Sequence, residues 1–119
     1  MGYRSQVGIV FQIEDFEEKL GKEPQDLQDR VRAAFKQASV DRELKGEGSD
    51  FHYRLLYWAD VKWYDDAYAE LVWLRNYRVT APSTTTFVRL GDDVEDVVEE
   101  YNDADDCPFD LSWQREITW

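Results

Sequence analysis

Apolar and polar side chains alternate along residues 50–64, a stretch rich in aromatic residues. The odd positions are all apolar or aromatic, namely Phe51, Tyr53, Leu55, Tyr57, Ala59, Val61 and Trp63. This period-two alternation predicts a long β-strand with one buried face. Because Leu56 and Trp58 occupy the other face, we expect the middle of the strand to be covered on both sides, as in the centre of a sheet.

Three further segments have strand-like patterns. Residues 3–13 carry apolar side chains at alternate positions: Val7, Ile9, Phe11 and Ile13. Residues 84–90 are rich in β-branched side chains and are followed by Gly91, which predicts a third strand. Alternation returns at the C-terminus, where it predicts one final strand through Leu111, Trp113, Ile117 and Trp119.

Two helical segments are expected before the central strand. Residues 14–20 form a short acidic helical turn that ends at Gly21. Residues 24–40 begin with Pro24, which suits the first turn of a helix, and carry a narrow apolar stripe: Leu27, Val31, Ala34, Phe35 and Ala38. The charged residues and glycines of segment 41–50 predict a solvated loop.

Two more helices are expected after the central strand. Asp65 or Asp66 is a suitable N-cap for a helix that runs to about Tyr77. Residues 92–101 have apolar side chains at i, i+3, i+4 and i+7, namely Val94, Val97, Val98 and Tyr101, which predicts an acidic amphipathic helix. The alternation of strands and helices favours an α+β two-layer sandwich of one domain, residues 1–119, with about four strands and the helices mainly on one face.

Charge limits the choice of partner. The chain of 119 residues has 26 acidic and 14 basic residues and a formal net charge of −12. Affinity for a nucleic-acid backbone comes from Lys and Arg, so direct nucleic-acid binding is not expected. We expect instead a protein partner with a basic surface. The acidic residues concentrate in residues 92–106, which contain nine acids and no base.

The single cysteine, Cys107, has no second cysteine for an internal disulfide. No apolar N-terminal run resembles a signal peptide or a membrane span. These features predict a protein of the reducing cytoplasm that does not insert into a membrane.

Catalytic and metal-binding signatures are scarce. One histidine, His52, and one cysteine are poor ingredients for nucleophilic catalysis or for a zinc site. Residues 102–106 are rich in oxygen donors but lack the glycine and glutamate of a calcium-binding EF-hand loop. The abundant carboxylates give no reason to select an acid/base pair. We therefore expect no cofactor, no metal and no enzymatic activity.

Two sets of residues are candidates for partner binding. The acidic set would imitate the negative charge of a phosphate backbone and consists of Asp92, Asp93, Glu95, Asp96, Glu99, Glu100, Asp103, Asp105 and Asp106. Helical periodicity also places Trp73 and Tyr77 on the outer face of the helix 65–77, where large aromatic rings are typical interface anchors. The alternatives are that the acids only confer solubility, and that loop 41–50 or a partner chain of a homodimer covers the two rings.

Short motifs in order along the chain resemble small uncharacterised proteins encoded by tailed bacteriophages and prophages. They are Met1-Gly2-Tyr3-Arg4-Ser5, Val61-Lys62-Trp63-Tyr64 and Phe87-Val88-Arg89-Leu90-Gly91-Asp92. The resemblance implies a phage accessory protein made in the bacterial cytoplasm, and it supplies no established activity. We therefore expect a non-enzymatic protein that binds and modulates a host or phage protein, for example as an inhibitor of a nucleic-acid-handling or defence complex. The alternatives are a small enzyme with a carboxylate pair and a homo-oligomeric structural or assembly component.

Overall fold

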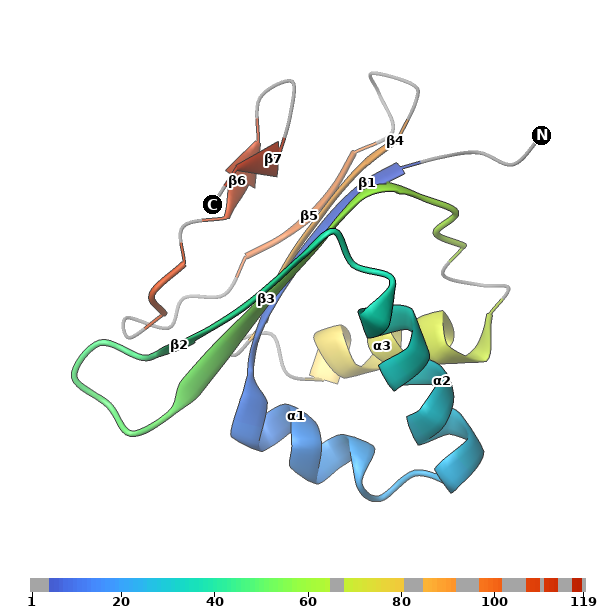
Figure 1. The fold of residues 1–119 in the computed structure, drawn as a ribbon, viewed down its shortest axis with the longest axis horizontal. Helices are drawn as coiled ribbons and strands as arrows, with labels where there is room; N and C mark the ends of the chain where they lie inside the picture. The colour runs from blue at the N-terminus through green and yellow to red at the C-terminus, as the bar shows by residue number, and fades with distance from the viewer. Residues whose placement is uncertain are drawn as a thin grey trace.

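A computed structural model describes residues 5–64, 68–80, 85–91, 97–101, 107–109, 111–113 and 117–118. The expected α+β architecture is confirmed, with helices on one face of an antiparallel sheet. Figure 1 shows all three described helices on the same side of the sheet and a short C-terminal hairpin on the opposite side.

The main sheet has five strands in the order β2-β3-β1-β4-β5, and all neighbours are antiparallel. In chain order the strands are β1 (Ser5–Gln12), β2 (Val40–Lys45), β3 (His52–Val61), β4 (Thr85–Gly91) and β5 (Val97–Glu100). The long aromatic strand β3 lies between β2 and β1, so its expected interior position in the sheet is confirmed. The edges are the charged strand β2 and the short strand β5.

The helices are α1 (Ile13–Leu20), α2 (Gln25–Lys36) and α3 (Ala69–Thr80). The chain crosses from β1 to β2 through α1 and α2, and from β3 to β4 through α3. The order β2-β3-β1-β4 with these crossings is that of a ferredoxin-like split β-α-β unit, to which β5 adds an edge strand. Such a fold supports many functions, so function has to be argued from a site.

Apolar side chains pack on both faces of the sheet. Between the sheet and the helices, the rings of Phe11, Phe16 and Phe35 lie 4.3 to 5.7 Å apart and join β1 to α1 and α2. On the opposite face, Tyr53 and Leu55 belong to a second buried cluster. Coverage of both faces of β3, expected from its sequence, is therefore confirmed.

The second cluster is closed by the C-terminal segment. Leu111 and Ile117 are both buried, and they pack over Gly8 in the centre of the sheet. A Cβ atom at Gly8 would lie 3.0 Å from Leu111 Cδ1 and 3.2 Å from Ile117 Cγ2. Glycine therefore permits the close approach of this segment, which contains the hairpin β6 (Ser112–Trp113) and β7 (Ile117–Thr118).

Several sequence-based expectations were wrong. The segment expected to be a solvated loop contains β2, because backbone pairing with β3 accommodates its exposed charged side chains at a sheet edge. The expected acidic helix contains β5, because two adjacent valines pair with β4 and four residues are too few to separate the two periodicities. The C-terminal strand is a hairpin, and α2 ends at Lys36, four residues before the expected end.

Candidate functional site

A pocket of about 430 Å³ lies between α2, the end of β3 and the start of α3. Its walls come from segments far apart in the sequence, since Ala34 belongs to α2, Trp58 to β3 and Leu71 to α3. Its volume falls in the range of small-ligand sites. The fold creates this pocket where the aromatic strand leaves the sheet and turns towards the first residues of α3.

Aromatic rings form much of the pocket wall. The rings of Trp58 and Trp63 lie 5.1 Å apart and are tilted by 56°. Trp58 Nε1 donates a hydrogen bond to the carbonyl oxygen of Ala34 at 3.1 Å, which fixes the first ring against α2. The exposed ring of Tyr68 lines the same pocket. Trp58 and Trp63 are only 3% and 4% exposed, so the accessible π-surface of the pocket is the ring of Tyr68, which is 44% exposed.

Two buried polar atoms in this wall lack a hydrogen-bond partner within the described structure. One is the donor Nε1 of Trp63, a residue that is only 4% exposed. The other is the acceptor Oε2 of Glu70, which lies in the first turn of α3. A buried polar atom without a partner costs about 1–3 kcal/mol, and more when it is charged. One wall thus holds an unsatisfied donor and an unsatisfied carboxylate oxygen.

Glu70 differs in this respect from other carboxylates of the described chain. Several of these accept hydrogen bonds from side chains of the same chain, among them Asp15 from Lys19 and Tyr77, Asp41 from Arg54, and Glu100 from Arg78. Lys62 also lines the pocket, but no ion pair joins it to Glu70 in the part of the chain that the structure describes. Glu70 Oε2 therefore has no donor among the described residues, and because it is buried, an external donor can reach it only when the side chain turns.

An exposed apolar row continues from the pocket along α3. Tyr68, Val72 and Val79 stand at i, i+4 and i+11, with Arg75 between them at i+7, so the four residues share one side of the helix. The exposed fractions of Tyr68, Val72 and Val79 are 44%, 37% and 67%. Clustered exposed apolar side chains are typical of interaction surfaces. Tyr68 belongs to both the pocket and this row, which makes them one continuous surface.

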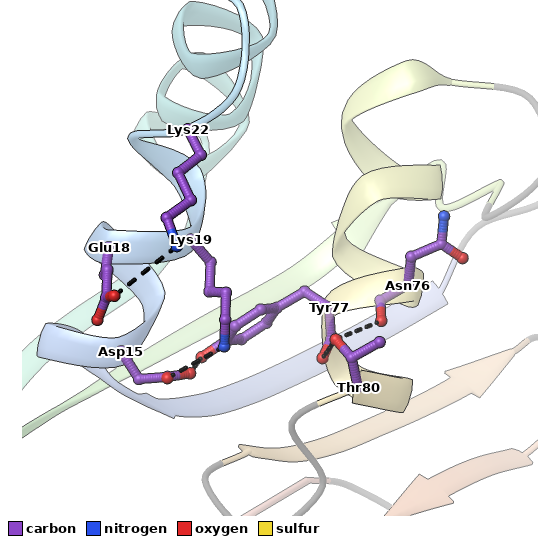
Figure 2. A network of polar contacts seen from close by, with 7 residues as sticks. All are labelled: Asp15, Glu18, Lys19, Lys22, Asn76, Tyr77 and Thr80. Atoms are coloured by element: carbon purple, nitrogen blue, oxygen red, sulfur yellow. Dashed lines mark hydrogen bonds and ion pairs between the residues drawn. The ribbon is translucent and has the colours of Figure 1, made fainter.

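The two aromatic residues expected on the outer face of α3 are packed against α1 instead. The rings of Trp73 and Tyr77 are stacked at 5.5 Å and 8°, and both contact Phe16 edge-on. Tyr77 is 3% exposed and donates a hydrogen bond from its hydroxyl to Asp15 Oδ2 at 2.7 Å (Figure 2). The expectation that Tyr77 is exposed was wrong, because helix α1 covers that side of α3.

A smaller pocket of about 300 Å³ lies between α1 and α3, with Trp73, Tyr77, Lys19 and Lys22 among its lining residues. Both lysines already have partners, since Lys19 pairs with Asp15 at 3.3 Å and Lys22 lies 3.8 Å from Glu18 (Figure 2). Both lysines of this pocket therefore have an ion-pair partner within the chain, in contrast to Glu70 Oε2 of the larger pocket.

The acidic set is only partly described. Glu100 accepts hydrogen bonds from the buried Arg78, so it has an internal structural partner. Glu99 is exposed on β5, where the Tyr101 hydroxyl donates to it at 3.4 Å. The other seven residues of the set lie outside the described residues: Asp92, Asp93, Glu95, Asp96, Asp103, Asp105 and Asp106. Their role stays a prediction.

The only histidine of the chain pairs with a carboxylate. His52 Nδ1 lies 3.3 Å from Glu14 Oε1, and the backbone N–H of His52 donates to the same oxygen at 2.6 Å. Partial burial raises the pKa of Glu14, but hydrogen bonds from the backbone and ring of His52 outweigh it, so the net shift is downward. In the described residues, no group of three or more His, Cys, Asp or Glu side chains is arranged to hold a metal ion.

The sequence did not indicate Trp63 and Glu70 as site residues. Trp63 continues the apolar alternation of β3, and Glu70 is one of 26 acids, so neither stands out without the fold.

Comparison with family models, curated proteins and solved structures finds no match for this chain. None of the described helices is long and apolar enough to cross a membrane.

Proposed function

We propose that this chain is a non-enzymatic binding protein that occupies a basic surface of a protein partner. The observation that carries the proposal is the aromatic pocket, where Glu70 Oε2 has no hydrogen-bond partner among the described residues, beside the exposed apolar row of α3. The formal net charge of −12 supports the choice of a basic partner, because opposite charges accelerate and orient association.

The resemblance to phage-encoded proteins narrows the proposed setting to the bacterial cytoplasm and the partner to a host or phage protein. Proteins that handle nucleic acids, including defence complexes, have basic surfaces for phosphate groups. The chain would inhibit such a protein by covering its basic surface. In this proposal the pocket and the row on α3 supply specific contacts, and the acids of residues 92–106 supply attraction at longer range.

The test is affinity capture of the tagged full chain from infected bacterial lysate at low and high salt, with partners identified by mass spectrometry. Val79→Lys removes an exposed apolar contact from the row and repels a basic partner. Phe51→Lys is the matched control, because Phe51 is also exposed but precedes the start of β3, at the opposite end from the pocket. We expect a basic partner at low salt that Val79→Lys loses and Phe51→Lys retains.

Two results would contradict this function. One is a partner that both lysine variants retain equally, because the α3 surface would then not be the contact. The other is self-association of the purified chain, measured by analytical ultracentrifugation, that Val79→Lys abolishes. That outcome would assign the surface to a second copy of the chain and favour the homo-oligomeric assembly component.

A further inference from the structure

We propose that the pocket at Glu70 receives one arginine side chain of the basic partner. Its guanidinium group pairs with the Glu70 carboxylate and lies against the exposed ring of Tyr68, next to the buried indole of Trp63. This inference rests on the proposed function and names the chemical group that the pocket recognises.

The carboxylate provides the first argument. Glu70 Oε2 is shielded from solvent and has no hydrogen-bond partner among the described residues. Arginine presents five N–H donors in a planar fork that matches a carboxylate, and hydrogen bonds between charged groups are about twice as strong as neutral ones. As the guanidinium enters, Glu70 turns about its side-chain bonds in the first turn of α3 and gains the donor that it lacks.

The same arrangement occurs twice among the residues that the structure describes. The guanidinium carbon of Arg78 lies 3.7 Å from the centre of the Phe87 ring, and the same guanidinium pairs with Glu100. In β3, the guanidinium carbon of Arg54 lies 5.3 Å from the centre of the Phe35 ring, and Arg54 pairs with Asp41. Each site combines an aromatic ring, a carboxylate and an arginine.

The pocket contains the first two components of that arrangement but no arginine among its lining residues. The accessible ring of the pocket is that of Tyr68, and arginine stacks on aromatic faces more often than lysine does. The pocket is therefore better suited to an arginine than to a lysine of the partner.

The indole N–H of Trp63, which has no acceptor among the described residues, favours a peptide over a free cation as the occupant of the pocket. Trp63 Nε1 requires an acceptor, which neither a guanidinium group nor a simple amine provides. The backbone carbonyl groups next to an arginine residue are acceptors. A peptide segment with one inserted arginine therefore offers partners to both unsatisfied atoms of the wall.

Lys62 lines the same pocket and opposes a second cation. Two substitutions in the pocket should therefore change the affinity for arginine in opposite directions. Glu70→Gln removes the attraction and weakens arginine binding by about tenfold, as expected for a charged hydrogen bond. Lys62→Gln removes the repulsion and strengthens binding by about twofold.

The experiment is a titration of the ¹⁵N-labelled full chain with N-acetyl-arginine N-methylamide, followed by the indole N–H signals in NMR spectra. The matched probe is the citrulline analogue, which has nearly the same shape but no charge. Trp63→Phe assigns the Trp63 signal. The expected result is a saturable shift of the Trp63 signal by the arginine probe, with at least about tenfold weaker binding of the citrulline probe.

Equal binding of the two probes, or no shift at Trp63, overturns the inference. The control variant Glu18→Gln removes an exposed carboxylate of α1 and should bind like the native chain. If Glu18→Gln weakens binding as much as Glu70→Gln, the effect is one of net charge and the inference is wrong. A partner captured from lysate together with a pocket that ignores the arginine probe would refute this inference alone and leave the proposed function standing.

Discussion

The guanidinium group of Arg78 is paired with the carboxylate of Glu100: its Nε and Nη2 atoms both lie 3.0 Å from Glu100 Oε1. The Arg78 side chain is 2% exposed, and its guanidinium also covers the ring of Phe87 in β4. This pair connects the last turn of α3 to the edge strand β5. It fixes the helix whose first turn contributes Glu70 to the pocket.

Glu100→Gln should therefore destabilise the fold, because it removes the negative charge of Glu100 from its ion pair with the buried guanidinium of Arg78. Removing one partner of a buried ion pair costs about 3–5 kcal/mol, and we expect about 2 kcal/mol here because the Glu100 side chain is 35% exposed. Urea denaturation measures the loss. Glu99→Gln, on the exposed side of the same strand, is the control and should change stability by less than about 0.5 kcal/mol. Equal stability of the two variants would contradict a structural role of the pair.

Gly8→Ala should weaken the packing of the C-terminal segment on the sheet. The new methyl group would meet Leu111 Cδ1 at 3.0 Å and Ile117 Cγ2 at 3.2 Å, and both side chains are buried with little room to move. We expect a loss of about 1 kcal/mol in the free energy of unfolding. In a Leu111→Ala background most of this cost should disappear, which a double-mutant cycle would reveal. An additive double variant would show that the two positions are not in contact.

Tyr77→Phe separates a structural role from a partner-binding role. It removes the hydroxyl that donates to Asp15 at 2.7 Å but keeps the ring stacked on Trp73 and edge-on to Phe16. A hydrogen bond to a charged group contributes about 1.5–3 kcal/mol, and we expect about 1.5 kcal/mol at this partly buried site. Thermal unfolding should show the loss while affinity for the captured partner stays unchanged. A fall in affinity with unchanged stability would show instead that Tyr77 contacts the partner.

Asp41 should make stability depend on acid pH. Hydrogen bonds from Arg54, at 2.9 and 2.8 Å, lower the pKa of Asp41 and outweigh its partial burial. Because the folded pKa lies below the unfolded value of about 3.9, the pair stabilises the fold above that pH and loses its effect as pH falls through the folded pKa.

The comparison with Asp41→Asn isolates this pair. The native chain should be more stable at neutral pH by less than about 1 kcal/mol, because Asp41 is 47% exposed and solvent screens the pair. Urea denaturation over a pH series should show the difference shrinking below about pH 4. A difference that is the same at every pH would exclude the Asp41 carboxylate as its source.

The sequence predicted the elements whose periodicity is long and regular. Alternation over β3 and the apolar stripe of α2 both correspond to elements in the structure, because β3 buries side chains on both faces and α2 buries Val31 and Phe35. The edge strands were missed because their backbone pairing, rather than their side chains, places them in the sheet. In β2, three consecutive charged residues separate Val40 from Leu44, so the period-two pattern is absent and only the pairing with β3 reveals a strand.

The pocket at Glu70 could not be predicted from the sequence, because contacts between distant segments form it. Helical periodicity placed Trp73 and Tyr77 on one side of α3 but did not show that α1 would cover that side. Glu70 became a candidate only when its unpartnered oxygen was found next to the aromatic wall built by β3 and its C-terminal extension. Whether a polar atom has a hydrogen-bond partner depends on the tertiary structure, so no local sequence pattern predicts it.

The most direct measurement is the affinity of the purified, captured partner for three full-length chains, determined by isothermal titration calorimetry. The account predicts that Glu70→Gln weakens binding by at least about tenfold, which corresponds to about 1.4 kcal/mol, while Glu18→Gln changes it by less than about twofold. Both variants remove one negative charge, so their difference isolates the pocket from net charge. Equal affinities for the two variants would contradict the claim that the pocket at Glu70 binds the basic partner.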